Sequence, residues 1–258
     1  MKVEPDPIPD EKATTPNSFW KVPRLWPDEE CFILGGGPGL QLVDVNRLKG
    51  RCVIAINMAF TLADWLPAMY FADHRLFKRI GPDLANFGGL KMTTAKGLMG
   101  TPGLKIVRQK NGVGISRDPS IVWWNKSSGA CAINIAVHFG VRRIVLLGYD
   151  MRKAEAPKLR VEQRGEGWFV VNPYSGQDVY DKPLPRDEAE TMALKTKANW
   201  HEHYPKPTGK TFNPYPRFLD PFKKIAYDLH GLNIECVNAT PGSALTEFPI
   251  VHPAEVLP

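Results

Sequence analysis

The sequence has no long apolar segment and no pattern typical of a secretory leader. None of its apolar runs reaches the length of about 18 residues that a membrane-spanning helix needs. The stretch 1–12, MKVEPDPIPDEK, is acidic and rich in proline, whereas a signal peptide begins with basic residues and continues into an apolar segment. We therefore expect a cytoplasmic protein without a membrane span.

Cysteine is scarce and lacks metal-binding spacing. No Cys-x-x-Cys pair occurs, and each of the four cysteines lies within or beside an apolar run: Cys31, Cys52, Cys131 and Cys236. Cysteines in such positions behave as small buried hydrophobic residues in a reducing compartment. The pattern predicts free thiols and no zinc site.

The charge is modestly basic, and the basic residues form no stripe. Thirty-three Lys and Arg against 27 Asp and Glu give a formal net charge of +6, spread along 258 residues. An excess of this size favours a phosphate-bearing ligand and is compatible with DNA as a partner. It does not require nucleic acid, because nucleic-acid-binding domains concentrate their basic residues on one face.

Internal repeats and low-complexity tracts are missing too, and the length suits one large domain. Prolines are frequent in 1–28, so we expect this segment to run extended over the surface. In 29–258, short apolar runs alternate with helical patterns, which predicts a single α/β, Rossmann-like domain with a mostly parallel sheet and helices on both faces. The predicted strands are 31–34, 52–56, 68–72, 90–94, 121–124, 144–147 and 232–237, and the predicted helices are 130–140, 187–203 and 221–230.

The segment 151–186 interrupts this alternation. It contains mixed charges, several prolines and one short apolar piece, 168–171, which predicts a hairpin or a mobile flap inserted into the domain. Because the segment follows directly after a predicted strand, we expect it to overhang the carboxyl end of the sheet, where ligands bind in α/β proteins.

A glycine cluster follows the first predicted strand: Gly35, Gly36, Gly37, Pro38 and Gly39. Glycine has no Cβ, so backbone N–H groups in such a loop can approach a phosphate or a ribose. The spacing is not Gly-x-Gly-x-x-Gly and no Walker lysine follows, which excludes the dinucleotide fingerprint and the P-loop. The cluster predicts a nucleotide contact of another kind; the alternative is a tight strand-to-helix turn.

Polar residues end the next two predicted strands. The amide of Asn57 offers a donor and an acceptor that could read a base or a ribose, although Asn also closes turns. Asp73 could bind a divalent cation or a sugar hydroxyl, or could instead cap the helix that begins near Arg75.

Two later stretches offer groups at the same edge of the sheet. Ser127, Ser128 and Gly129 open an apolar helix, whose positive end suits a phosphate, with helix capping as the alternative. Gly148, Tyr149 and Asp150 close a buried strand. This would place Asp150, as a candidate catalytic residue, where ligands collect in open α/β sheets, unless it only caps a turn.

The segment NWHEHYPKPTGKTFN contains two histidines beside a carboxylate, His201, Glu202 and His203. A histidine with a pKa near neutrality can serve as the general base that deprotonates an acceptor hydroxyl. Zinc is not expected here because no third ligand stands at suitable spacing. Both histidines could also lie on a solvated surface.

Together these motifs resemble the single-domain bacterial sialyltransferases and their relatives, the motility accessory factor glycosyltransferases and the hydroxymethylpterin pyrophosphokinases, which are often met in phage genomes. The shared pattern runs in order along most of the chain, as a glycine loop, a strand-end Asn, a Ser-Gly helix start, a strand ending in Gly-[Ile/Tyr]-Asp and an Asn-to-Phe-Pro stretch. Here it corresponds to 35–40, Asn57, 128–136, 148–150 and 238–249. Two positions depart from it: Gly36 replaces an Asn and Gly39 replaces a Ser, so the sugar and the base cannot be carried over.

The resemblance implies a glycosyltransferase that takes a sugar from a nucleotide sugar, with His201 or His203 as the base. The acceptor would be a hydroxyl of a surface glycan or of modified DNA, in the host cytoplasm if a phage encodes the protein. One alternative is a pyrophosphokinase with Mg²⁺ bound by Asp73 and Asp150. The other is a non-catalytic nucleic-acid-binding phage protein that uses Trp123 and Trp124, although an apolar strand predicts that these rings pack in the core.

Overall fold

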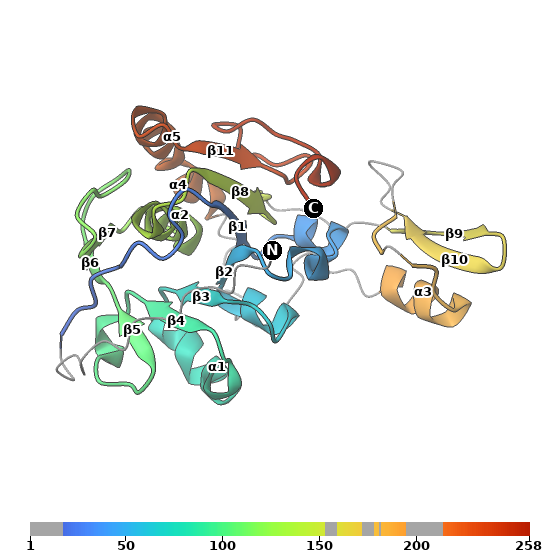
Figure 1. The fold of residues 1–258 in the computed structure, drawn as a ribbon, viewed down its shortest axis with the longest axis horizontal. Coiled ribbons are helices and arrows are strands. Elements are labelled where there is room, and N and C mark those ends of the chain that lie inside the picture. The colour runs from blue at the N-terminus through green and yellow to red at the C-terminus, as the bar shows by residue number, and fades with distance from the viewer. Residues whose placement is uncertain (1–17, 153–158, 172–177, 181, 195–213) are drawn as a thin grey trace.

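A seven-stranded sheet forms the centre of the molecule (Figure 1). The computed structural model describes residues 18–152, 159–171, 178–180, 182–194 and 214–258. The strands of the sheet are β1 (Glu30–Leu34), β2 (Cys52–Ile56), β3 (Ala68–Phe71), β4 (Leu90–Thr93), β5 (Leu104–Ile106), β8 (Arg143–Leu147) and β11 (Glu235–Asn238). They lie in the order β11-β8-β1-β2-β3-β4-β5, and every neighbouring pair is parallel.

Apolar side chains cover both faces of this sheet. Ile33 of β1 belongs to a buried cluster with the apolar residues of α2 (Ser128–Phe139) and α5 (Phe222–Gly231). Its neighbour Phe32 belongs to a second cluster, which contains the apolar residues of α1 (His74–Asn86). Successive residues of a strand point to opposite faces, so the continuous apolar runs in the sequence reflect burial on both sides. The structure confirms the predicted Rossmann-like α/β fold.

The strand order reverses direction at β1. Strands β2 to β5 follow β1 on one side of the sheet, whereas β8 and β11 lie on its other side. The connections that leave β1 and β8 therefore run toward opposite sides of the sheet. Open α/β sheets bind their ligands at this topological switch point.

Shorter elements complete the main body. They are the 3-10 helices η1 (Pro38–Leu42), η2 (Val45–Leu48), η3 (Asn57–Leu62), η4 (Lys96–Leu98) and η5 (Pro253–Glu255), and the short helix α4 (Tyr215–Leu219). In the part of the chain that the structure describes, none of the helices combines the length and the apolar character that a membrane crossing requires. All four cysteines are free thiols, as predicted, and burial raises the pKa of Cys52 and of Cys131 to about 12.

One predicted strand does not join the central sheet. Residues 121–124 contain β7 (Ile121–Trp123), which pairs with β6 (Arg108–Lys110) in a separate two-stranded sheet. Buried Asn134 of α2 accounts for this position, because its side chain accepts the N–H of Ser116 at 3.0 Å and donates to the carbonyl of the same residue at 3.1 Å. These bonds tie the chain ahead of β7 to the helix.

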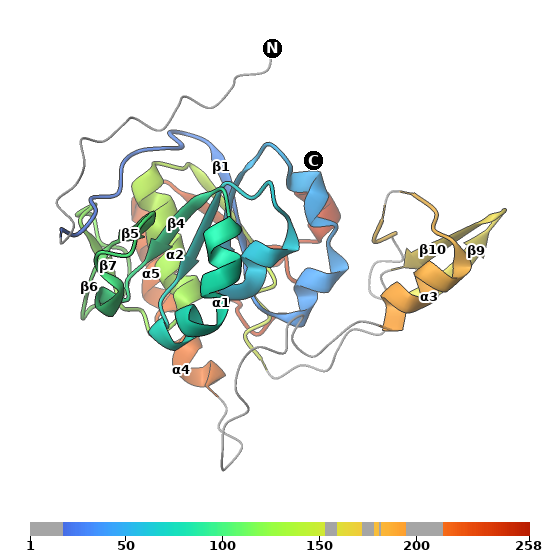
Figure 2. The same ribbon diagram turned by 90° about the horizontal axis from the view of Figure 1, so that it is seen from below.

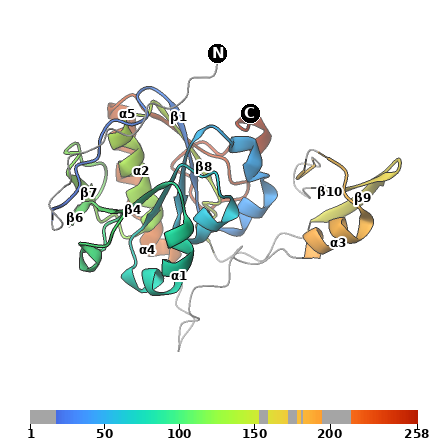
Figure 3. The same ribbon diagram turned by 60° about the horizontal axis from the view of Figure 1, so that its bottom comes forward.

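The insertion after β8 forms a small unit of its own. β9 (Arg160–Arg164) and β10 (Gly167–Val171) make the predicted hairpin, and α3 (Arg186–Leu194) packs on it around buried Val170. The unit stands to one side of the main sheet in Figure 1, Figure 2 and Figure 3. The charge of Asp44, at the start of η2, contributes to the raised pKa of Tyr180, behind the effect of burial. The role of this unit as a flap stays a prediction, and the predicted helix beyond residue 194 lies outside the described residues.

The described part of the N-terminal segment lies against the edge of the sheet. Trp20 donates its backbone N–H to the carbonyl of Ile106 in β5 at 2.7 Å, and Val22 donates to the carbonyl of Pro119 at 2.9 Å. Both side chains are buried. The segment therefore covers an edge strand that would otherwise expose unpaired backbone groups.

Candidate functional site

Two loops meet at the switch point and are joined by backbone hydrogen bonds. The glycine loop follows β1, and Gly148–Asp150 follow β8. Gly35 donates to the carbonyl of Leu147 at 2.7 Å, and Gly37 donates to that of Gly148 at 2.9 Å. The N–H of Gly39 donates to both carboxylate oxygens of Asp150, at 3.1 Å each. The two sequence motifs thus form one structure.

This contact explains why the loop contains glycine. A Cβ on Gly35 would lie 2.5 Å from the carbonyl oxygen of Gly148, and a Cβ on Gly37 would lie 2.0 Å from Oδ2 of Asp150. Any larger residue would push the loops apart. The sequence predicted that the N–H groups of this loop face a phosphate, but those of Gly35, Gly37 and Gly39 donate to protein acceptors. The structure corrects this explanation, because the glycines instead allow the backbones of two loops to approach each other.

Asp150 is the buried carboxylate of this site. It is only 7 % exposed, and burial raises its pKa, while the Gly39 N–H and the nearby charge of Arg152 lower it. Asp150 also helps to raise the pKa of half-buried Tyr215, for which burial is the larger cause. Helix α4 therefore brings the Tyr215 phenol within electrostatic reach of this carboxylate, a neighbour that the sequence did not indicate.

The stretch after β11 supports the loop after β8 from the other side. Thr240 Oγ1 accepts the backbone N–H of Tyr149 at 3.0 Å, and the hydroxyl of Ser243 donates to the carbonyl of Tyr149 at 2.5 Å. The backbone N–H of Ala244 donates to the carbonyl of Asp150 at 2.9 Å. The motif 238–249 thus holds Tyr149 and Asp150 in place.

The first turn of α2 joins the same cluster through Tyr149. The hydroxyl of Tyr149 donates to the carbonyl of Gly129 at 3.1 Å, and a Cβ on Gly129 would lie 2.9 Å from its ring. Ser127 caps the helix by accepting the N–H of Ala130 at 3.2 Å, which is the capping role weighed for it above. Ser128 follows it in the partly exposed first turn. The positive end of a twelve-residue helix dipole is therefore joined to the loop after β8 through Tyr149.

Asp73 and Asn57 lie farther along the carboxyl edge. Asp73 caps α1 by accepting the N–H of Arg75 at 2.8 Å and pairs with its guanidinium at 2.9 Å, and this hydrogen bonding lowers the pKa of the carboxyl group. Asp73 follows the end of β3, and Asp150 follows the end of β8. These two strand ends are three strand spacings apart in the sheet, which is about 14 Å. One Mg²⁺ ion, with ligands at about 2.1 Å, does not bridge residues placed in this way.

Strained backbone is concentrated at the carboxyl edge. Of the six described non-glycine residues with positive φ, four follow strands there or lead into α2: Asn57, Asn125, Lys126 and Met151, with φ between 45° and 59°. Such conformations are costly for Lys126 and Met151, whereas asparagine tolerates them, and they cluster at functional sites. Residue type does not indicate the positive φ of Lys126 and Met151.

The two proposed catalytic histidines, His201 and His203, lie outside the described residues. Among the residues that are described, no group of three or more His, Cys, Asp and Glu side chains is placed to bind a metal ion. Buried His138 of α2 lies beside the carbonyl of Ile121, with Nε2 at 2.9 Å, and burial lowers its pKa. His138 therefore has a structural position.

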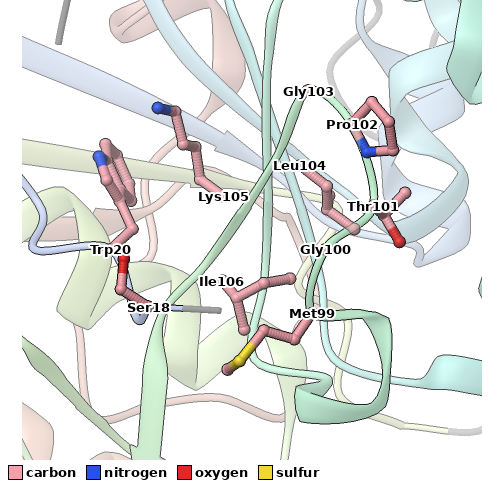
Figure 4. A pocket seen from close by; sticks show the side chains of 10 residues that line it. All are labelled: Ser18, Trp20, Met99, Gly100, Thr101, Pro102, Gly103, Leu104, Lys105 and Ile106. Carbon is pink, nitrogen blue, oxygen red and sulfur yellow. The ribbon is translucent and has the colours of Figure 1, made fainter. Parts of the chain in front are cut away.

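A pocket of about 270 Å³ lies at the other side of the sheet, beside β5 (Figure 4). Trp20, Lys105 and the loop 99–104 line it, and the Lys105 Nζ is 5.9 Å from the centroid of the Trp20 ring. Three strands, β2 to β4, separate β5 from β1 in the sheet. This pocket is not part of the switch-point site.

No protein-family model matches the chain. No curated protein matches it either. Among solved structures, the chain is similar to the sialyltransferase CstII from Campylobacter jejuni in complex with the substrate analogue cytidine-5'-monophosphate, at 13% identity over 87% of this chain and 85% of that chain, with a TM-score of 0.42. It is also similar to the same enzyme in complex with CMP-3FNeuAc, at 12% identity over 87% and 86%, with a TM-score of 0.42. At this identity, the function of this chain has to be inferred from its own residues.

Proposed function

We propose that the protein is a glycosyltransferase that moves a sugar from a nucleotide sugar to a hydroxyl acceptor. The observation that carries the proposal is the meeting of three elements at the switch point: the glycine loop, Tyr149–Asp150 and the first turn of α2. This is where an open α/β sheet takes a nucleotide. The motif order described above supports a sugar nucleotide as the ligand.

The nucleotide lies across the two joined loops, with its phosphate toward Ser128 and Gly129. The helix dipole and the free end of the first turn stabilise the negative charge there. Asn57, at the end of β2, reads the ribose or the base through its amide. Asp150 is a positioning residue, because it holds the glycine loop through the N–H of Gly39.

The reaction is a direct displacement. The oxygen of the acceptor hydroxyl forms a bond to the anomeric carbon, and the bond from that carbon to the phosphate oxygen breaks. His201 or His203 takes the hydroxyl proton, and the phosphate leaves with the electron pair of the broken bond. The insertion 151–186 limits access of water, which would otherwise hydrolyse the donor. The acceptor is a glycan or a hydroxymethylated base of DNA, and the net charge of +6 favours an anionic one.

The competing reaction is Mg²⁺-dependent pyrophosphoryl transfer from ATP. The separation of Asp73 and Asp150 and the pairing of Asp73 with Arg75 do not favour it.

Donor turnover distinguishes the two reactions. We expect the purified protein to release a nucleotide slowly from one class among CMP-, UDP- and GDP-sugars when water replaces the acceptor. The release of this nucleotide should not depend on added Mg²⁺. Formation of AMP from ATP with strict Mg²⁺ dependence, and no turnover of any sugar nucleotide, would instead establish the pyrophosphokinase.

A further inference from the structure

A second face of the molecule exposes aromatic rings next to the start of α2. Trp124 is 43% exposed, Tyr227 is 75% exposed and Val113 is 44% exposed. These are three of the five large hydrophobic residues that are exposed in the described part of the chain. The sequence predicted that Trp124 packs in the core, and its exposure corrects that prediction. We call residues 110–114, 124–126, 215–220 and 223–228 the Trp124 face.

Hydrogen bonds show that this face is continuous. The N–H of Gly114 donates to Oδ1 of Asn125 at 2.8 Å, next to Trp124 in the chain. The following residue, Ile115, donates its N–H to Oδ2 of Asp228 in α5 at 2.9 Å. The loop that contains Val113 therefore contacts both the Trp124 side and the α5 side. In Figure 1, β6, β7, α4 and α5 lie together at the left of the molecule.

A basic side chain lies over each of the two aromatic rings. The Cζ atom of Arg217 lies 5.3 Å from the centroid of the Trp124 ring, and Nζ of Lys224 lies 5.0 Å from that of Tyr227. The face has more basic than acidic groups: Lys110, Lys126, Arg217, Lys223 and Lys224 against Asp220 and Asp228. Lys126 pairs with Asp220, and Lys224 pairs with Asp228. The surplus positive charge complements an anionic partner.

We propose that the Trp124 face binds single-stranded nucleic acid. Unpaired bases stack on the rings of Trp124 and Tyr227, while the phosphates approach Lys110, Arg217 and Lys223, the combination by which sequence-tolerant single-strand binders work. Duplex bases have no free face for such stacking, and an acidic polysaccharide has no planar base. Because 125–127 lead directly from Trp124 to α2, a bound strand passes beside the switch point. The inference does not depend on the transferase reaction.

Fluorescence anisotropy of a labelled oligothymidylate of about 20 nucleotides tests the proposal, with heparin and a duplex of equal length as competitors. We expect Trp124→Ala to weaken binding about 5- to 50-fold and Trp124→Phe, which keeps a stacking ring, to weaken it less than about 5-fold. Circular dichroism checks that the variants are folded. Binding that is unchanged in Trp124→Ala, or as tight for duplex or heparin as for the single strand, would overturn the proposal.

A matched pair of arginine variants separates stacking from net charge. Arg186 lies over Trp168 in the hairpin unit, 5.0 Å from its ring centroid, as Arg217 lies over Trp124. Both Arg217→Gln and Arg186→Gln remove one positive charge, and we expect only Arg217→Gln to weaken oligothymidylate binding, by at least about 3-fold. Equal weakening in the two variants would contradict a defined face. Binding of mononucleotides, measured separately, reports on the switch-point site alone.

Discussion

Replacing Gly35 by alanine is expected to lower the free energy of unfolding by about 3 kcal/mol and to abolish nucleotide binding. The added Cβ would lie 2.5 Å from the carbonyl oxygen of Gly148 and 3.0 Å from its carbonyl carbon. These are backbone atoms, so no rotation of a side chain relieves the overlap. The ends of β1 and β8 would separate, and the hydrogen bonds from Gly37 and Gly39 would lengthen. Chemical denaturation and nucleotide titration measure the two effects.

Gly231→Ala is the matched control for this variant. Gly231 is the last residue of α5, and a Cβ there would meet no atom within 4 Å. Alanine is favoured over glycine in a helix by up to about 1 kcal/mol, so this variant should be as stable as the wild type or slightly more stable. A Gly35→Ala protein with unaltered stability and nucleotide affinity would show that the close approach of the two loops has no consequence for the site.

Replacing both His201 and His203 by alanine is expected to reduce transfer by about 10²- to 10⁴-fold, the usual contribution of a general base. The proposed role of these residues is to accept the proton of the acceptor hydroxyl, so the loss should appear in kcat. Nucleotide binding should persist, because the loops that form the proposed nucleotide site come from β1, β8 and α2. The two single variants identify which histidine is the base.

His230→Ala provides a matched control, since His230 is an exposed histidine in the last turn of α5. We expect full transfer activity from this variant. If the double histidine variant retains transfer, the base lies elsewhere; if it loses nucleotide binding together with transfer, the histidines belong to the binding site and the proposed division of roles is wrong.

The fold was largely predictable because its strands are buried on both faces. The apolar runs at β1, β2, β3 and β8 stand out in the sequence for this reason. β5 was missed because only one of its three residues, Ile106, is buried, which leaves no apolar run. β7 was assigned to the wrong sheet, since local apolarity does not indicate that Asn134 fixes the preceding loop on α2.

The site was predictable only where it coincides with short motifs. The glycine loop and Gly148–Asp150 were both recognised, but their direct contact depends on the strand order, which brings β1 beside β8. Tyr215 comes from a segment rich in proline with no periodic pattern, and only the effect of Asp150 on its pKa in the folded protein links it to the site. The positive φ angles of Lys126 and Met151 are a property of the folded backbone, and residue type does not predict them.

A thermal-shift screen of CMP, UDP, GDP, ADP and ATP, with and without Mg²⁺, tests the central claim most directly. A ligand that binds only the folded protein and is present at about 100 times its Kd adds about 2.7 kcal/mol of stability. For a domain of this size, that corresponds to a rise of about 5 °C or more in Tm. We predict such a rise for one base without Mg²⁺, and its loss in Gly35→Ala. The absence of any shift with all five nucleotides would contradict a nucleotide site at the switch point.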